Sequence, residues 1–199
     1  MEIIVMRKIE LINKLKKGFT LAEALVTIGI IGAVAAIGVP VLMQGASDAE
    51  TVARVKKSYE VLSQGYYSVV AENKNLPVYM WSGDICSGIF ADMKGSGANG
   101  LYTTSDGINY HCQVENNNVT ITVDTNGNKG PNAGGQDVFT FVSDANSLSL
   151  VPLGNSAGGF ATCQTAAGIE CTGWVIKHGN LKYLECPNEL QWDGNYNCQ

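Results

Sequence analysis

The feature that most constrains this chain is an apolar run from Phe19 to Met43 that contains a single charged residue, Glu23. As a helix that rises ~1.5 Å per residue, the run would be roughly 37 Å long, enough to cross a hydrocarbon core of ~30 Å. A carboxylate inside such a segment is costly unless it is paired, and the run supplies no basic residue. The run therefore predicts a transmembrane helix whose lone acid requires a partner.

Charge is divided unevenly around this run. Residues 1–18 hold five basic and two acidic residues, a net charge of +3, whereas the rest of the chain carries a net charge of −8. A basic flank before an apolar span predicts a cytoplasmic N-terminus and places everything after Met43 outside the cytoplasm. The acidic remainder argues against nucleic acid as a partner, because phosphate groups select basic surfaces.

Residues 16–23 read Lys-Lys-Gly-Phe-Thr-Leu-Ala-Glu and lead into the apolar run. Together with the run they resemble the class III signal of type IV pilins and of the pseudopilins of type II secretion. The resemblance covers roughly residues 14–70. It implies that residues 1–18, begun at either of two methionines, form a leader that a prepilin peptidase removes after Gly18. It also implies that this enzyme N-methylates Phe19, and it places the family's glutamate at Glu23 and its helix proline at Pro40.

The resemblance further implies a life cycle. The precursor would sit in a bacterial inner membrane, and an inner-membrane assembly platform would then move it into a filament on the cell surface or in the periplasm. The filament would be a homo-oligomer or a mixed polymer with other pilins. Cleavage would create an amine on Phe19, with which Glu23 of a neighbouring subunit could pair and so set the register. The alternative is that Glu23 only reaches the lipid headgroups. Pro40 should loosen the helix near Ala36, because it removes one hydrogen bond.

An amphipathic stripe continues the helix beyond Met43. Apolar side chains recur there at spacings of three and four, which is the period of a helix with one buried face. They are Val52, Val55, Tyr59, Leu62, Tyr66 and Val69. We expect one helix from Phe19 to Glu72, with 19–43 as the transmembrane and assembly half and 44–75 as the amphipathic half. A coiled coil with a partner is the alternative.

Residues 76–199 are expected to form an extracytoplasmic globular domain. Segments 118–123, 138–142 and 148–152 are rich in β-branched and aromatic residues and predict strands. Residues 82–110 and 153–170 are glycine-rich and predict loops, and residues 174–184 predict a short hairpin. The fold class is therefore α+β, and the resemblance implies that it is type IV pilin-like. A long N-terminal helix packs on a small antiparallel sheet, followed by a loop-rich, disulfide-bonded C-terminal region.

All six cysteines follow the apolar run, and an even number in an exported domain predicts disulfides. Six cysteines allow 15 pairings. Closeness in the sequence favours Cys163–Cys171 and Cys186–Cys198, which leaves Cys86–Cys112.

Oxygen-bearing side chains alternate between the first two predicted strands, in residues 124–137. Asp124, Asn126 and Asn128 are spaced like the first ligands of a calcium loop, and Asp137 could complete the set. The full EF-hand pattern is absent. The segment resembles a loop found in many pilin-like proteins, and some pseudopilins bind calcium in a comparable loop. The alternative is a turn built by its Asn-Gly and Gly-Pro pairs without an ion.

The sequence shows no catalytic motif, so we expect a structural protein without an enzymatic cofactor. His111 and Cys112 would point to opposite faces of a strand and so would not form a catalytic pair. The large aromatics are expected in the core or against the sheet: Trp81, Trp174, Trp192, Tyr66, Tyr67 and Tyr79. The expected function is that of a pilus (fimbrial) subunit. The alternatives are a pseudopilin of type II secretion and, in a different class, a membrane-tethered binding domain or enzyme.

Overall fold

The computed structural model describes residues 20–73, 84–115, 118–143, 148–165 and 168–199, with the side chains of 37–46 left outside the description. The chain divides into two compact units, Met1–Gly45 and Ala46–Gln199. Helix α2 spans Leu21–Glu72 and belongs to both units. Its observed end at Glu72 is the predicted one, whereas Phe19 at the predicted start lies outside the described residues.

The second half of α2 packs through the predicted stripe. Five stripe residues are buried and Tyr59 is half-buried, with its ring stacked on Phe141 at a centroid distance of 5.3 Å. Ser58 is also buried on this face, and its hydroxyl lies 2.9 Å from the hydroxyl of Tyr110. The amphipathic half of the helix therefore forms one wall of the core, as the spacing predicts.

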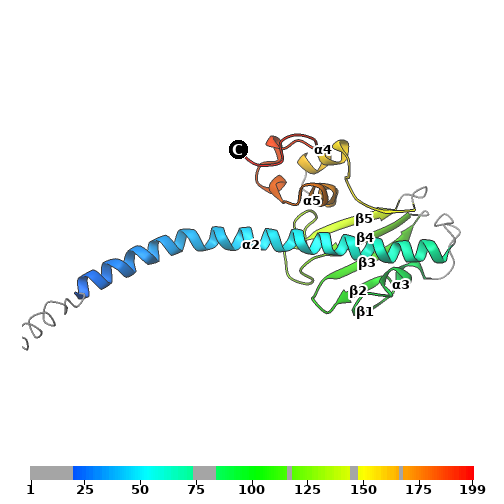
Figure 1. Cartoon of the computed structure of the whole chain (residues 1–199), viewed down its shortest axis with the longest axis horizontal. Helices are drawn as coiled ribbons and strands as arrows, with labels where there is room; N and C mark the ends of the chain where they lie inside the picture. The colour runs from blue at the N-terminus through cyan, green and yellow to red at the C-terminus, as the bar shows by residue number, and fades with distance from the viewer. Residues whose placement is uncertain (1–19, 74–83, 116–117, 144–147, 166–167) are drawn as a thin grey trace, which may run out of the picture. The chain divides into compact units, whose positions relative to one another are not determined.

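A six-stranded antiparallel sheet faces this helix, with its strands in sequence order from β1 to β6. Figure 1 shows the labelled strands β1 to β5 side by side in this order. The strands are β1 Gly95–Ala98, β2 Leu101–Thr104, β3 Asn109–Glu115, β4 Asn118–Asp124, β5 Val138–Ser143 and β6 Leu150–Pro152. In β4 the buried residues alternate with partly exposed ones, so Val119, Ile121 and Val123 face the core. The three predicted strands correspond to β4, β5 and β6, and the α+β fold with a helix on an antiparallel sheet is confirmed.

The prediction of a loop over residues 82–110 is wrong. This segment holds helix α3 (Ile85–Phe90), β1, β2 and the start of β3. The side chain of Asp84 begins α3 by accepting a hydrogen bond from the Ser87 N–H. The β1–β2 hairpin turns at Asn99 and Gly100, which both have positive φ, the conformation that a tight hairpin requires.

Two further predictions about the C-terminal region are wrong. The expected loop 153–170 contains helix α4 (Ala157–Thr165), and the expected hairpin is helix α5 (Thr172–His178), preceded by the 3-10 helix η2 (Ile169–Cys171). Two more 3-10 helices follow, η3 (Lys182–Leu184) and η4 (Pro187–Glu189). Trp174 is fully buried and stacks on Phe160 of α4 at 4.1 Å, so burial of aromatic rings stabilises these short helices.

Three disulfides join the described cysteines, and all three predicted pairs are confirmed. Cys86–Cys112 ties α3 to β3, Cys163–Cys171 ties α4 to η2, and Cys186–Cys198 closes the C-terminal segment. The prediction that the large aromatic residues lie in the core or against the sheet is confirmed for some of them and wrong for one. Trp174 and Tyr66 are fully buried and Trp192 is partly buried, but Tyr67 is 55% exposed because it is not part of the buried stripe of α2. Trp81 and Tyr79 lie outside the described residues.

Candidate functional site

The cleavage site predicted at Gly18–Phe19 and the methylation site at Phe19 lie outside the described residues. The first described residue is Thr20, directly before α2. The first turn of the helix therefore carries the described part of the predicted assembly motif.

Thr20 and Glu23 form a reciprocal cap at the start of α2. The Thr20 N–H and the Thr20 hydroxyl both donate to Oε2 of Glu23, each at 2.8 Å, and the Glu23 N–H donates to the Thr20 hydroxyl at 3.2 Å. This is the capping box that Ser/Thr-x-x-Glu sequences form at helix N-termini. The sequence-based interpretation assigned Glu23 to an intersubunit pair, or alternatively to the lipid headgroups, and missed this cap, although the Thr-x-x-Glu spacing would have revealed it.

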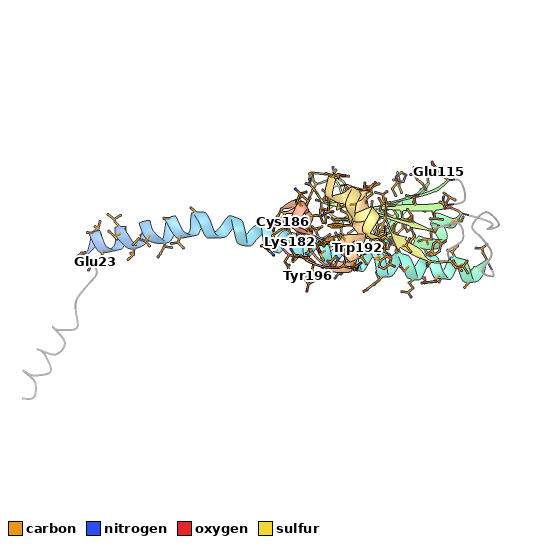
Figure 2. All side chains as sticks on the ribbon, turned by 90° about the horizontal axis from the view of Figure 1, so that it is seen from above. Glu23, Glu115, Lys182, Cys186, Trp192 and Tyr196 are labelled. Carbon is orange, nitrogen blue, oxygen red and sulfur yellow. A yellow bond between two sulfur atoms is a disulfide. The ribbon has the colours of Figure 1, made fainter. Side chains whose placement is uncertain are left out.

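The helix surface that follows the cap is apolar and uncovered. Seven large apolar side chains between positions 21 and 34 are between 60% and 78% exposed, namely Leu21, Leu25, Val26, Ile28, Ile30, Ile31 and Val34. They are distributed around the helix instead of forming one stripe. Figure 2 shows side chains extending from the helix ribbon that follows Glu23. A helix that is apolar on all sides is normally surrounded by other apolar groups.

Within the part of the chain that the structure describes, no helix is both long enough and apolar enough to cross a membrane. Residues 37–43 of the predicted span, including the side chain of Pro40, fall outside the described side chains, and the predicted loosening near Ala36 stays a prediction. The backbone of α2 remains helical through Pro40.

The predicted calcium residues lie at the loop between β4 and β5. The Asp137 carboxylate accepts hydrogen bonds from the N–H groups of Asn132 and Ala133, at 2.8 and 2.7 Å, and from the side-chain amide of Asn126 at 3.1 Å. Asp124 accepts from the Asn126 N–H at 3.2 Å. Burial raises the pKa of Asp124, partly opposed by that hydrogen bond. The structure thus brings three of the four predicted residues together.

The fourth predicted residue is directed elsewhere. Asn128 is exposed, and its side-chain oxygen lies 3.5 Å from the side-chain nitrogen of Asn109 on β3. No cluster of three or more His, Cys, Asp or Glu side chains suited to a metal occurs among the described residues. Amide and carbonyl oxygens can also bind calcium, so calcium binding by this loop stays a prediction.

Arg54 connects α2 to the same loop and was not anticipated. Its guanidinium donates to the carbonyl oxygens of Thr125 at 3.0 Å and of Asp106 at 3.3 Å, and pairs with Glu50 at 2.9 Å. An arginine with several donors in a planar fork can hold two carbonyl groups at once. Arg54 therefore holds the first residue of the loop and the β2–β3 turn against the helix.

The surroundings of the two histidines, His111 and His178, are those of residues that stabilise the fold. His111 is exposed while Cys112 is buried in its disulfide. The two side chains therefore point to opposite faces of β3, as predicted for neighbours on a strand. His178 packs against Trp174 at a centroid distance of 4.0 Å and stacks on Tyr196 at 5.6 Å. Its Nε2 lies 3.1 Å from the Trp192 carbonyl oxygen, and burial lowers its pKa.

Comparison with known proteins bears on the N-terminal part of the chain. Residues 13–39 match the family model described as the prokaryotic N-terminal methylation motif. No curated protein and no solved structure matches the chain. The matched segment contains Gly18, Phe19 and the Thr20–Glu23 cap. The chain therefore carries the prokaryotic N-terminal methylation motif, which is the class III prepilin signal of the type IV pilin and pseudopilin family.

Proposed function

We propose that this protein is a structural subunit of a type IV pilus-like filament and that it has no enzymatic activity. In this proposal a prepilin peptidase cuts after Gly18 and methylates Phe19. The precursor is held in the inner membrane by residues 19–43, with the basic leader in the cytoplasm. The assembly platform then transfers the subunit into a filament, alone or with other pilins, on the cell surface or in the periplasm.

The observation that carries the proposal is the uncovered apolar surface of α2 directly behind the methylation motif. Seven large apolar side chains that are each at least 60% exposed would be unfavourable in water, at roughly 25 cal/mol per Å² of apolar surface. A bilayer can cover this surface before assembly, and neighbouring helices can cover it in a filament. At the small residues Gly29 and Gly32, a Cβ added to the backbone would meet no atom within 4 Å, so both positions leave room for such a neighbour.

The proposal is tested with three single substitutions in cells that express the full chain. Gly18→Ala should leave the leader attached, which immunoblotting detects as a larger protein. Glu23→Ala should be cleaved normally but should not enter filaments, measured in sheared surface fractions and in periplasmic fractions. Thr20→Val is the matched control for the cap, because it removes the hydroxyl partner but keeps the carboxylate of Glu23.

The control separates two roles of Glu23. If Glu23 acts by pairing with a neighbour's Phe19 amine, Thr20→Val subunits should still assemble while Glu23→Ala subunits do not. If the two variants assemble equally well, the intersubunit pair is refuted. Normal processing of Gly18→Ala would refute the cleavage site. A pseudopilin carries the same signal, so failure to form surface filaments together with impaired protein secretion in a deletion strain would assign the subunit to type II secretion.

A further inference from the structure

The chain contains two Asn-Gly pairs, Asn99-Gly100 and Asn126-Gly127. An asparagine followed by glycine is chemically reactive, because glycine has no side chain to shield its backbone nitrogen. That nitrogen can attack the carbonyl carbon of the asparagine side chain, provided that the fold leaves both groups free to meet. The two pairs lie in very different surroundings.

The first pair forms the exposed turn of the β1–β2 hairpin. Asn99 is exposed, and among the described residues its side chain makes no hydrogen bond. The Gly100 carbonyl oxygen accepts the Cys112 N–H at 2.7 Å, but the Gly100 N–H has no partner in the described part of the chain. The attacking nitrogen and the amide that it would attack are therefore both unpaired.

The attack requires the turn to open, because Asn99 and Gly100 hold the positive φ angles of a tight hairpin, 54° and 78°. Strand β1 offers little resistance to this opening. It is the edge strand of the sheet (Figure 1), and its four residues are small and exposed, so it buries no large apolar side chain. Segments with few buried contacts open locally more often than the core does.

The second pair is held by the loop between β4 and β5. The Asn126 side-chain amide donates to Oδ2 of Asp137 at 3.1 Å, and the Asn126 N–H donates to Oδ1 of Asp124 at 3.2 Å. Gly127 is buried, and a Cβ added there would lie 2.7 Å from the Gly107 carbonyl oxygen. Attack at this pair therefore requires the loss of hydrogen bonds to two carboxylates and of a packed contact.

We propose that Asn99 is a site of spontaneous deamidation, whereas the fold protects Asn126, and this holds whether or not the chain forms filaments. In the reaction, the Gly100 nitrogen forms a bond to Cγ of Asn99 and loses its proton. The bond from Cγ to Nδ2 breaks, and ammonia leaves with that proton. Water then opens the resulting cyclic imide at either of its carbonyl carbons, which leaves aspartate or isoaspartate at position 99. Water is the only co-reactant, and the net change converts an amide into a carboxylic acid.

The two products affect the hairpin differently. Aspartate keeps the backbone and adds one negative charge at the turn. Isoaspartate routes the main chain through the side-chain carbons and so lengthens the turn by a methylene group. A two-residue turn fixes the pairing of its strands, here Ala98 with Leu101, so the longer backbone should release β1 from β2.

The test follows the purified full chain in detergent micelles during incubation in a slightly alkaline buffer. Peptide mass spectrometry locates each amide-to-acid mass increase and so separates Asn99 from Asn126. A second sample is reduced and unfolded in urea, which removes the protection of the fold from both pairs. Asn99→Gly is the matched variant, since glycine suits the positive φ but has no side-chain amide.

In the folded protein, we expect Asn99 to convert at least about tenfold faster than Asn126, because losing one hydrogen bond to a carboxylate corresponds to roughly that factor. In the unfolded sample, the two rates should be similar. Asn99→Gly should show no conversion at position 99 and an unchanged rate at Asn126. Equal rates in the folded protein, or faster conversion of Asn126, would overturn the inference.

Hydrogen–deuterium exchange tests the consequence for the hairpin. Molecules that contain isoaspartate at position 99 should exchange the amides of β1 and β2 faster than fresh protein does. The variant Asn99→Asp should keep the wild-type exchange rate, because its backbone is unchanged. If isoaspartate leaves the exchange of β1 and β2 unaltered, the turn does not hold β1 and this part of the inference fails.

Discussion

Helices α2 and α3 lie very close together at Gly65, and this contact allows a quantitative prediction. A Cβ added at this position would lie 2.1 Å from the Ile89 carbonyl oxygen and 3.0 Å from the carbonyl carbon. An ordinary contact between these atoms is more than 3 Å long, so Gly65→Ala requires α3 to move by roughly 1 Å. The Cys86–Cys112 disulfide and the Asp84 cap restrain that movement.

The magnitude follows from two opposing effects. Alanine is favoured over glycine inside a helix by about 1 kcal/mol. Forcing extra volume into a packed contact costs about 1–3 kcal/mol, with the higher end expected where the opposing group is backbone. We therefore expect Gly65→Ala to lower the free energy of unfolding by about 1–2 kcal/mol, or the melting temperature by about 2–8 °C.

Gly158 in α4 supplies the matched control, because no atom lies within 4 Å of a Cβ added there. Gly158→Ala should be neutral or should stabilise the fold by up to about 1 kcal/mol. Urea titration of both variants, followed by tryptophan fluorescence, measures the two changes on the same protein. If Gly65→Ala is as stable as Gly158→Ala, the contact with the Ile89 carbonyl does not restrict this position and the packing argument fails.

Two further predictions concern pH and the disulfides. Burial lowers the pKa of His178 below its ordinary value of 6.5, so the unfolded chain binds the proton more readily. Stability should be full above pH 6.5 and fall as the pH drops below it, and His178→Gln should reduce this dependence in melting curves at about pH 7.5 and about pH 5. Replacing Cys86 and Cys112 with serine should cost about 3.5 kcal/mol for a 26-residue separation, compared with about 2.5 kcal/mol for the bridge that closes eight, as urea titrations can show.

Periodic burial made the helix and the later strands predictable. The α2 stripe and the alternation in β4 each repeat a buried position often enough for local sequence to identify the element. Strand β1 offers no such pattern, because its four residues are small and all exposed. Its hairpin could have been found from the pair Asn99-Gly100, which favours the turn that the structure contains.

The short C-terminal helices could not be predicted from the sequence because long-range contacts stabilise them. Helix α4 consists largely of glycine, alanine and threonine, which are not a strong helical pattern. Its Phe160 stacks on Trp174, and its Cys163 joins η2, so contacts formed only in the folded protein hold it in place. Two of the bridges were predictable because their cysteines lie close in sequence, eight and 12 residues apart, and the third pair was the one that remained.

The same distinction applies to the candidate site. The cap by Thr20 and Glu23 depends on residues three apart and was readable, although it was missed. The function of Arg54 depends on where loop carbonyls lie in space, and no spacing rule identifies it. The alternation of oxygen-bearing side chains singled out the loop between β4 and β5 but could not decide between a calcium site and a turn without an ion.

The cap at the start of α2 sharpens the question of what Glu23 does in a filament. Both Thr20 donors reach Oε2, and among the described residues no donor reaches Oε1. One oxygen can therefore cap the helix while the other accepts a neighbour's Phe19 amine. A cap contributes about 0.5–2 kcal/mol, whereas a carboxylate left unpaired in apolar surroundings costs several kcal/mol. Loss of the Thr20 hydroxyl should thus weaken the first turn without preventing assembly, whereas loss of the carboxylate removes both interactions. The difference between the two variants measures the intersubunit pair directly.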